Sequence, residues 1–178
     1  MVDWLAEILK SEFVAGVLLG VFLTGFGHWV SLCINRQNQK KVIIDFCLDT
    51  INNVSGYVKS LNEVLDISKN INMNDVDLID IEIGVYGRNR EHLIYITDEN
   101  YRKDIREFFS KVAIQTSKIR NNISLCNESK AMRNGFLPGN DQYNFHDKNV
   151  VLFWQESVDA CKKLDGLKAD SSSLIHRK

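Results

Sequence analysis

Residues 13–34 of the chain read FVAGVLLGVFLTGFGHWVSLCI and contain no charged side chain. As an α-helix this stretch would be about 33 Å long, enough to cross the hydrocarbon core of a bilayer. A helix buried in a globular domain is rarely apolar on every side. The sequence therefore predicts a single membrane-spanning helix within an anchor of residues 1–41, followed by a helical ligand or interaction domain over residues 42–170.

A cleaved signal peptide is the alternative interpretation of the apolar run. The preceding residues MVDWLAEILKSE carry Asp3, Glu7 and Glu12 against the single Lys10, and no A-x-A cleavage site follows. Signal peptides have a basic first region and a shorter apolar core. We therefore expect the helix to stay in the chain as an anchor in the lipid bilayer.

The charges that flank the span predict its orientation. Arg36, Lys40 and Lys41 follow it directly, whereas the residues before it are net acidic. Positively charged flanks stay on the cytoplasmic side of a membrane. We expect a single-pass protein of the inner membrane, with the N-terminus outside and the C-terminal domain in the cytoplasm.

Small residues recur along the predicted span at Gly16, Gly20, Thr24 and Gly27. Such spacing places them on one helix face, where a second helix can approach closely. We expect this face to drive self-association, although glycine is also common in membrane helices for other reasons. His28 lies beside the face, and it would either find a polar partner there or reach the membrane interface.

A heptad-like seam follows the span. Its positions are Ile44, Cys47, Ile51, Val54, Val58, Leu61 and Leu65. Alternating spacings of three and four residues are typical of a helix with one apolar face. The seam could pack between copies of the chain as a coiled coil, or within one chain as part of its core.

The predicted fold is mainly α with a small β-hairpin. Ile79, Ile81, Ile83 and Val85 alternate with polar residues, the period of a strand, and residues 92–97 (HLIYIT) form a second apolar run after a turn-like segment. Thr97 or Asp98 is placed to cap a long helix.

The end of the chain is predicted as a loop, a helix and a tail. Residues 130–146 (KAMRNGFLPGNDQYNFH) contain Gly135, Pro138 and Gly139 and lack a sustained period, so we expect an exposed loop. A last helix is expected from Asp147 or Lys148 to about residue 168, and residues 171–178 are expected to be a flexible tail.

Charge and cysteine usage exclude several classes of function. Residues 42–85 carry two Lys against eight acids, 2 − 8 = −6, and residues 86–146 carry ten Lys/Arg against seven acids, 10 − 7 = +3. That basic excess is too small for binding to duplex nucleic acid. The four cysteines are scattered without a CxxC pair, so neither a metal site nor a disulfide framework is predicted.

The sequence lacks the usual signatures of catalysis and cofactor binding. There is no nucleotide-binding glycine loop, nucleophile elbow or HExxH motif. We therefore expect no enzymatic activity and no cofactor.

One set of residues has the composition of a small nucleotide site. It combines residues of the predicted hairpin tip with residues of the predicted loop: Arg88, Asn89, Arg90 and His92, with Lys130, Arg133, Asn134, Phe136, Tyr143, Phe145 and His146. Guanidinium groups hold phosphates through paired hydrogen bonds, and aromatic rings stack on bases. We expect these residues to converge on one basic surface, and the alternative is two ordinary surface loops.

Four features occur together in the sequence: a short N-terminal segment, a glycine-containing span with Gly16 and Gly20, a basic boundary at Arg36, and a helical domain with Arg88, Arg90 and His92. In this combination the chain resembles the small membrane-anchored effectors of type III CRISPR systems. The resemblance implies an antiviral defence protein that binds cyclic oligoadenylate, a small anionic nucleotide, and perturbs the membrane. It also implies a homo-oligomer, with a tetramer suspected. The alternative is a membrane-anchored scaffold that recruits a protein partner without a small ligand.

Overall fold

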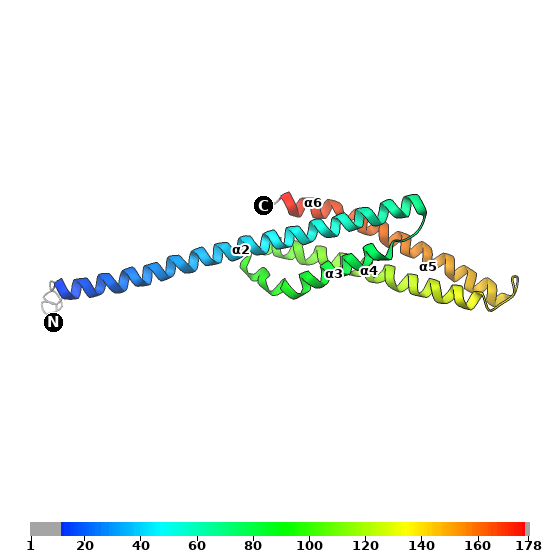
Figure 1. Ribbon diagram of the computed structural model, residues 1–178, viewed down its shortest axis with the longest axis horizontal. Helices are drawn as coiled ribbons and strands as arrows, with labels where there is room; N and C mark the ends of the chain where they lie inside the picture. The colour runs from blue at the N-terminus through cyan, green and yellow to red at the C-terminus, as the bar shows by residue number, and fades with distance from the viewer. Residues whose placement is uncertain (1–11, 177–178) are drawn as a thin grey trace. The chain divides into compact units, whose positions relative to one another are not determined.

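The structure is a computed structural model that describes the backbone of residues 12–176, and the side chains from residue 19 onward except that of residue 168 (Figure 1). Its elements, in chain order, are α2 (Glu12–Ser68), α3 (Met73–Asn89), the 3₁₀ helix η1 (Arg90–Tyr95), α4 (Glu99–Arg133), α5 (Asp141–Gly166) and α6 (Lys168–His176). No strand occurs among these residues. The chain divides into two compact units, Met1–Val42 and Ile43–Lys178.

The first unit contains the N-terminal part of α2, which presents apolar side chains to solvent. Phe22 stacks on Phe26 with 6.3 Å between ring centroids, and Phe26 contacts Trp29 at 5.9 Å. The Thr24 hydroxyl donates a hydrogen bond to the Gly20 carbonyl at 2.7 Å. The helix contains the whole predicted small-residue face, and Gly20, Thr24, Gly27 and His28 are all exposed; the surroundings of Gly16 lie outside the described side chains.

The prediction of a membrane-spanning helix is wrong by the measure of helix length and hydropathy. Within the described residues, no helix combines the length and the apolar character needed to cross a bilayer. The predicted single-pass topology and inner-membrane location are corrected together with it.

The second unit is a helical bundle around one core. The seam of α2 lies in this core, with Cys47, Ile51 and Leu61 fully buried and Ile44 half-buried against them. The same core takes in Ile79 of α3, Ile105 of α4 and residues of α5 and α6. The seam therefore packs within the chain, the second of the two arrangements that its spacing allows.

Side-chain caps define where three of these helices begin. The Asn72 side chain accepts a hydrogen bond from the Asn74 amide, the Asp98 carboxylate accepts one from the Tyr101 amide at 3.0 Å, and the Asn140 side chain accepts one from the Gln142 amide. Such caps satisfy backbone donors that the first helical turn leaves unpaired. The cap predicted at Asp98 is thus confirmed.

The predicted β-hairpin is wrong, because its first strand is helix α3 and its second is mostly η1. The alternating run also fits a helical period: Val76, Ile79 and Tyr86 are buried at spacings that share one helix face, whereas Ile81 is 59% exposed. Leu93 and Ile96 are buried without pairing as a strand. Packing on the core therefore decided between two periods that the short run satisfies equally.

The predicted loop and tail are also largely helical. α4 continues to Arg133 and α5 begins at Asp141, so only the turn over residues 134–140 remains of the expected loop (Figure 1). The tail predicted from residue 171 is helical as far as His176, and residues 177–178 lie outside the described chain. Leu174 anchors α6, since it is buried and its carbonyl accepts a hydrogen bond from the Tyr101 hydroxyl.

Core burial predicts that two isoleucines of α2 differ strongly in their contribution to the free energy of unfolding. Ile51 is 0% exposed and Ile67 is 86% exposed. Replacing Ile51 by Ala should lower the free energy of unfolding by about 2–5 kcal/mol, because it removes buried methyl groups and leaves a cavity. Urea denaturation measures this, with Ile67→Ala as the matched control expected to stay within about 0.5 kcal/mol of the parent. Equal losses in the two variants would contradict the assignment of the core.

Two buried thiols predict a loss of stability in alkali. Burial raises the pKa of Cys47 and of Cys161 from 9.0 to about 12. Above about pH 9 the unfolded chain releases the two thiol protons, whereas the folded chain keeps them. The two thiols therefore contribute fully to the free energy of unfolding below about pH 9, and their contribution decreases as the pH rises toward 12. The free energy of unfolding should therefore fall from pH 8 to pH 10.5 less steeply in Cys47→Ala than in the parent. Parallel pH profiles would show that burial does not hold Cys47 neutral.

Candidate ligand groove

An open groove of about 710 Å³ lies where the end of α3 and the start of η1 meet α4. Its lining comes from three elements: Ile83, Tyr86, Gly87, Arg90, Glu91, Arg106, Phe109, Ser110 and Ala113. The volume falls within the range of small-molecule sites, about 300–1,000 Å³. The lining combines an apolar part with two arginines and one acid.

A stacked aromatic pair fixes the floor of the groove. Tyr86 of α3 and Phe109 of α4 are nearly parallel, with 3.8 Å between ring centroids and 11° between ring planes. Phe108 packs its ring against the edge of Phe109 at 5.4 Å. Because Tyr86 and Phe109 are both buried, the two helices hold the floor in one geometry.

Within the part of the chain that the structure describes, the two arginines of the groove have no acidic partner, unlike Arg120 and Arg133. Arg120 contacts Asp77 at 2.7 Å and Asp80 at 2.5 Å, which occupies its guanidinium. Among the described residues, neither Arg90 nor Arg106 makes an ion pair or a hydrogen bond, and both side chains are exposed. Their donors are thus free for a ligand.

The electrostatics of the floor link both arginines to Tyr86. Burial raises the pKa of the Tyr86 phenol above 10.0, and the nearby Cys47 raises it further. Arg106 and Arg90 act in the opposite direction, since their positive charges favour the phenolate. Glu91 is the acid of the lining, and its carboxylate lies 4.0 Å from the His92 imidazole. The groove lining therefore has a net charge of +1, from two arginines and one acid.

The predicted hairpin-tip residues lie at the junction of α3 and η1, and only Arg90 of them lines the groove. The Arg88 guanidinium turns back along α3, with Nη1 3.8 Å from the position a Cβ would occupy on Gly84. The Asn89 side chain donates to the Val85 carbonyl at 2.9 Å. His92 stacks on Tyr95 at 6.3 Å. Three of the four predicted residues thus face away from this groove.

The predicted loop residues form a separate cluster at the α4–α5 turn. Arg133 pairs with Asp147 at 2.7 Å and lies over the Tyr143 ring at 5.8 Å. The His146 ring stacks on Phe136 at 6.0 Å and meets the edge of Phe145 at 5.3 Å. Lys130 and Asn134 contribute their backbone to the end of α4, where the Asn134 amide donates to the Lys130 carbonyl.

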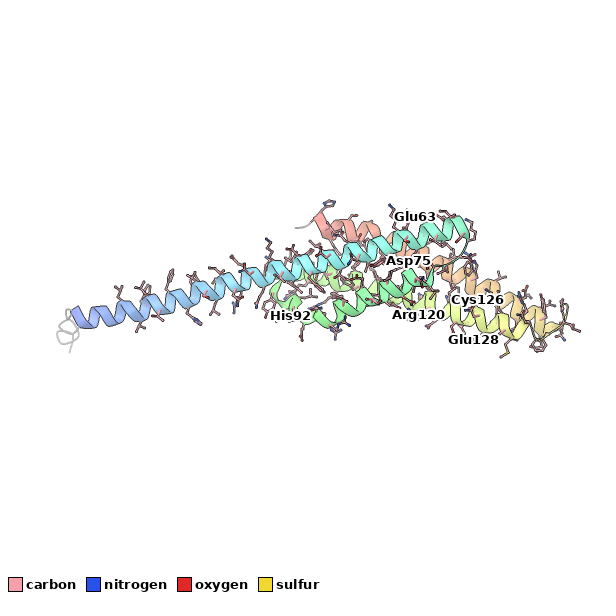
Figure 2. All side chains as sticks on the ribbon, viewed as in Figure 1. Glu63, Asp75, His92, Arg120, Cys126 and Glu128 are labelled. Atoms are coloured by element: carbon pink, nitrogen blue, oxygen red, sulfur yellow. The ribbon has the colours of Figure 1, made fainter. Side chains whose placement is uncertain are left out.

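The structure does not bring these two predicted groups together within one chain. Arg90 lies level with residues 106–113 of α4, and the part of the helix between these residues and Arg133 rises about 30–40 Å. Figure 2 shows His92 near one end of the α4–α5 pair, far from Cys126 and Glu128 on the distal half of α4. Arg106, Tyr86 and Phe109, which build the groove with Arg90, were not predicted. Reading residues 73–89 as a helix would have placed Tyr86 one turn before Arg90 and so pointed to this surface.

A spin-label distance tests this separation. Nitroxides at positions 90 and 134 should be more than about 30 Å apart within one chain, because more than half of the rigid helix α4 lies between the groove and the turn. The measurement is double electron–electron resonance on labelled protein diluted with unlabelled protein, which suppresses distances between chains. A distance below about 25 Å would restore the single converged site expected from the sequence.

Comparison with protein families, with curated proteins and with solved structures finds no match to this chain. The resemblance to membrane-anchored effectors accordingly gains no support beyond the features that suggested it.

Proposed function

We propose that the protein binds a small anionic ligand of the nucleotide class in the groove between η1 and α4. One observation carries the proposal: Arg90 and Arg106, from different elements, line the same groove and have no acidic partner among the described residues. A guanidinium without a partner offers a planar set of donors that matches a phosphate in two-point contacts.

The rest of the lining supports a ligand that has both a charged and a flat apolar part. Ile83, Ala113 and the edge of the aromatic floor supply apolar surface for a ring, and the exposed Ser110 hydroxyl can donate to or accept from a sugar. Arginine remains protonated in proteins and so cannot transfer a proton at neutral pH. The groove is therefore better suited to binding than to catalysis.

Ligand binding would connect η1 directly to α4. A phosphate held by both arginines would tie η1, which carries Arg90, to α4, which carries Arg106. A ligand shifts a conformational equilibrium only when it binds one arrangement better than another. Because the two arginines must converge to share a phosphate, the ligand favours the arrangement in which η1 is docked on α4. The protein would thus act as a ligand-responsive module.

A nucleotide panel with arginine variants tests the proposal. Mono-, di- and cyclic nucleotides, including cyclic oligoadenylates, should be screened for an increase in the melting temperature of the full chain, because a ligand specific to the folded state stabilises it by mass action. For the best ligand, Arg90→Ala and Arg106→Ala should each weaken binding about tenfold or more, as expected when a charged hydrogen bond worth about 1.5–3 kcal/mol is lost.

The matched control removes an arginine from the same helix but away from the groove. Arg120→Ala should leave the affinity within about twofold of the parent, since Arg120 pairs with Asp77 and Asp80 and does not line the groove. Calorimetric titration measures all three variants. The proposal fails if no member of the panel stabilises the chain, or if the control loses as much affinity as the groove variants.

A scaffold is the second candidate function, and the first unit supplies the observation in its favour. Its large apolar side chains are exposed, with Phe22 at 70%, Val21 at 67% and Trp29 at 60%. Exposed apolar surface of this extent is typical of interaction sites. The self-association predicted from the sequence is therefore still a proposal that these side chains support, and the nucleotide panel separates it from ligand binding.

A further inference from the structure

The distal half of the α4–α5 pair carries an exposed apolar stripe. Its members, here called the hairpin stripe, are Leu125 and Met132 of α4 and Phe145 and Leu152 of α5, which are 40–60% exposed. Each pair is seven residues apart, so the two residues of a pair share one face of their helix. At the turn beyond the stripe, Leu137 is 81% exposed.

Two contacts between α4 and α5 fix the register of the helices, and with it the position of the stripe. The Cys126 thiol donates to the Val150 carbonyl at 3.7 Å, and Arg133 pairs with Asp147 at 2.7 Å. Leu125 therefore lies level with Leu152. Met132, one residue before Arg133, lies near the level of Phe145. The four side chains form two rungs across the pair.

Helix geometry places all four members on the same side of the pair. Leu125 and Met132 each precede a residue that faces α5, namely Cys126 and Arg133. Phe145 likewise precedes His146, whose Nδ1 is buried, and Leu152 lies seven residues further along the same face as Phe145. In an α-helix, each residue is rotated by about 100° around the helix axis from the residue that follows it. Because the helices run antiparallel, these turns lead to the same side.

We propose that the hairpin stripe is a self-association surface, which a second copy of this chain covers to form a four-helix bundle. Two helices alone cannot bury both of their apolar faces, whereas two antiparallel pairs packed face to face can. A standard interface buries roughly 800 Å² per partner, and the exposed apolar side chains of the stripe and the turn would contribute to it. This surface differs from the small-residue face predicted in α2 and is independent of the ligand groove.

The charges beside the stripe select one of two symmetric arrangements. Glu128 and Lys148 are exposed. The register of α4 and α5 puts them at nearly the same level, and helix geometry puts each on the side of its helix that faces away from the other helix of the pair. With the two-fold axis parallel to the helices, α4 of one copy packs over α5 of the other, and Glu128 meets Lys148 twice. With the axis perpendicular to the helices, Glu128 would face Glu128 and Lys148 would face Lys148. Repulsion between like charges disfavours the second arrangement.

Disulfide trapping between full-length chains tests both the surface and the arrangement. Cys33 is first replaced by Ser, because it is half-buried whereas the other three cysteines are buried. One preparation then carries Glu128→Cys and another Lys148→Cys, and both are exposed to a mild oxidant separately and mixed. The mixture should give at least tenfold more cross-linked dimer than either preparation alone, because only the unlike positions approach within disulfide distance. Equal yields in all samples, or dimers formed mainly from one preparation alone, would overturn the proposal.

Substitutions at two adjacent residues test whether the cross-link depends on the hairpin stripe. Leu152→Asp in both chains should reduce the yield at least tenfold, since it places a charge in the apolar contact. Val151→Asp is the matched control: Val151 is 63% exposed and adjacent in sequence, but on the opposite side of the pair, so the yield should stay within about twofold. Thermal unfolding checks that both variants fold. If Leu152→Asp leaves the yield unchanged or Val151→Asp lowers it equally, the stripe is not the contact.

Discussion

The contact between Tyr86 and Phe109 determines how the rest of the bundle is built. It joins α3 to α4 at a centroid distance of 3.8 Å, and it lies on the same core as the buried seam of α2. A stacked pair of this kind contributes about 0.5–1.5 kcal/mol beyond the area it buries. Its larger effect is geometric, because it holds α3 and α4 together beside the groove that Arg90 on η1 and Arg106 on α4 both line.

Ion pairs distinguish Arg120 and Arg133 from the two arginines of the groove. Arg120 and Arg133 hold helices together, since each contacts a carboxylate on a neighbouring helix. These exposed or half-exposed pairs contribute little each to the free energy of folding, typically below about 1 kcal/mol. They do orient α3 and α5 against α4. Arg90 and Arg106 have no such structural task among the described residues, and this is the physical basis for assigning them to a ligand.

The sequence predicted helices well where a long apolar period met a capping residue. The seam from Cys47 to Leu65 and the helix capped by Asp98 are present as expected. The prediction from sequence was wrong where a short apolar run is compatible with both a strand and a helix. Ile79, Ile81 and Ile83 alternate with other residues as in a strand, but they also fit a helix that buries one side. Burial against α4 settles such a run, and that contact is not visible in local sequence. Of the predicted ligand residues, Arg90 lines the groove, while Arg106 was missed because nothing in the sequence indicates that it has no partner.

The length of α4 has a consequence for how the protein can change over evolution. The groove lies near the start of this 35-residue helix and the hairpin stripe near its end. Residues more than about 10 Å apart that share no partner usually contribute independently to stability. Substitutions that retune ligand preference at one end can therefore accumulate without disturbing assembly at the other, so the two surfaces are free to diverge separately in related chains.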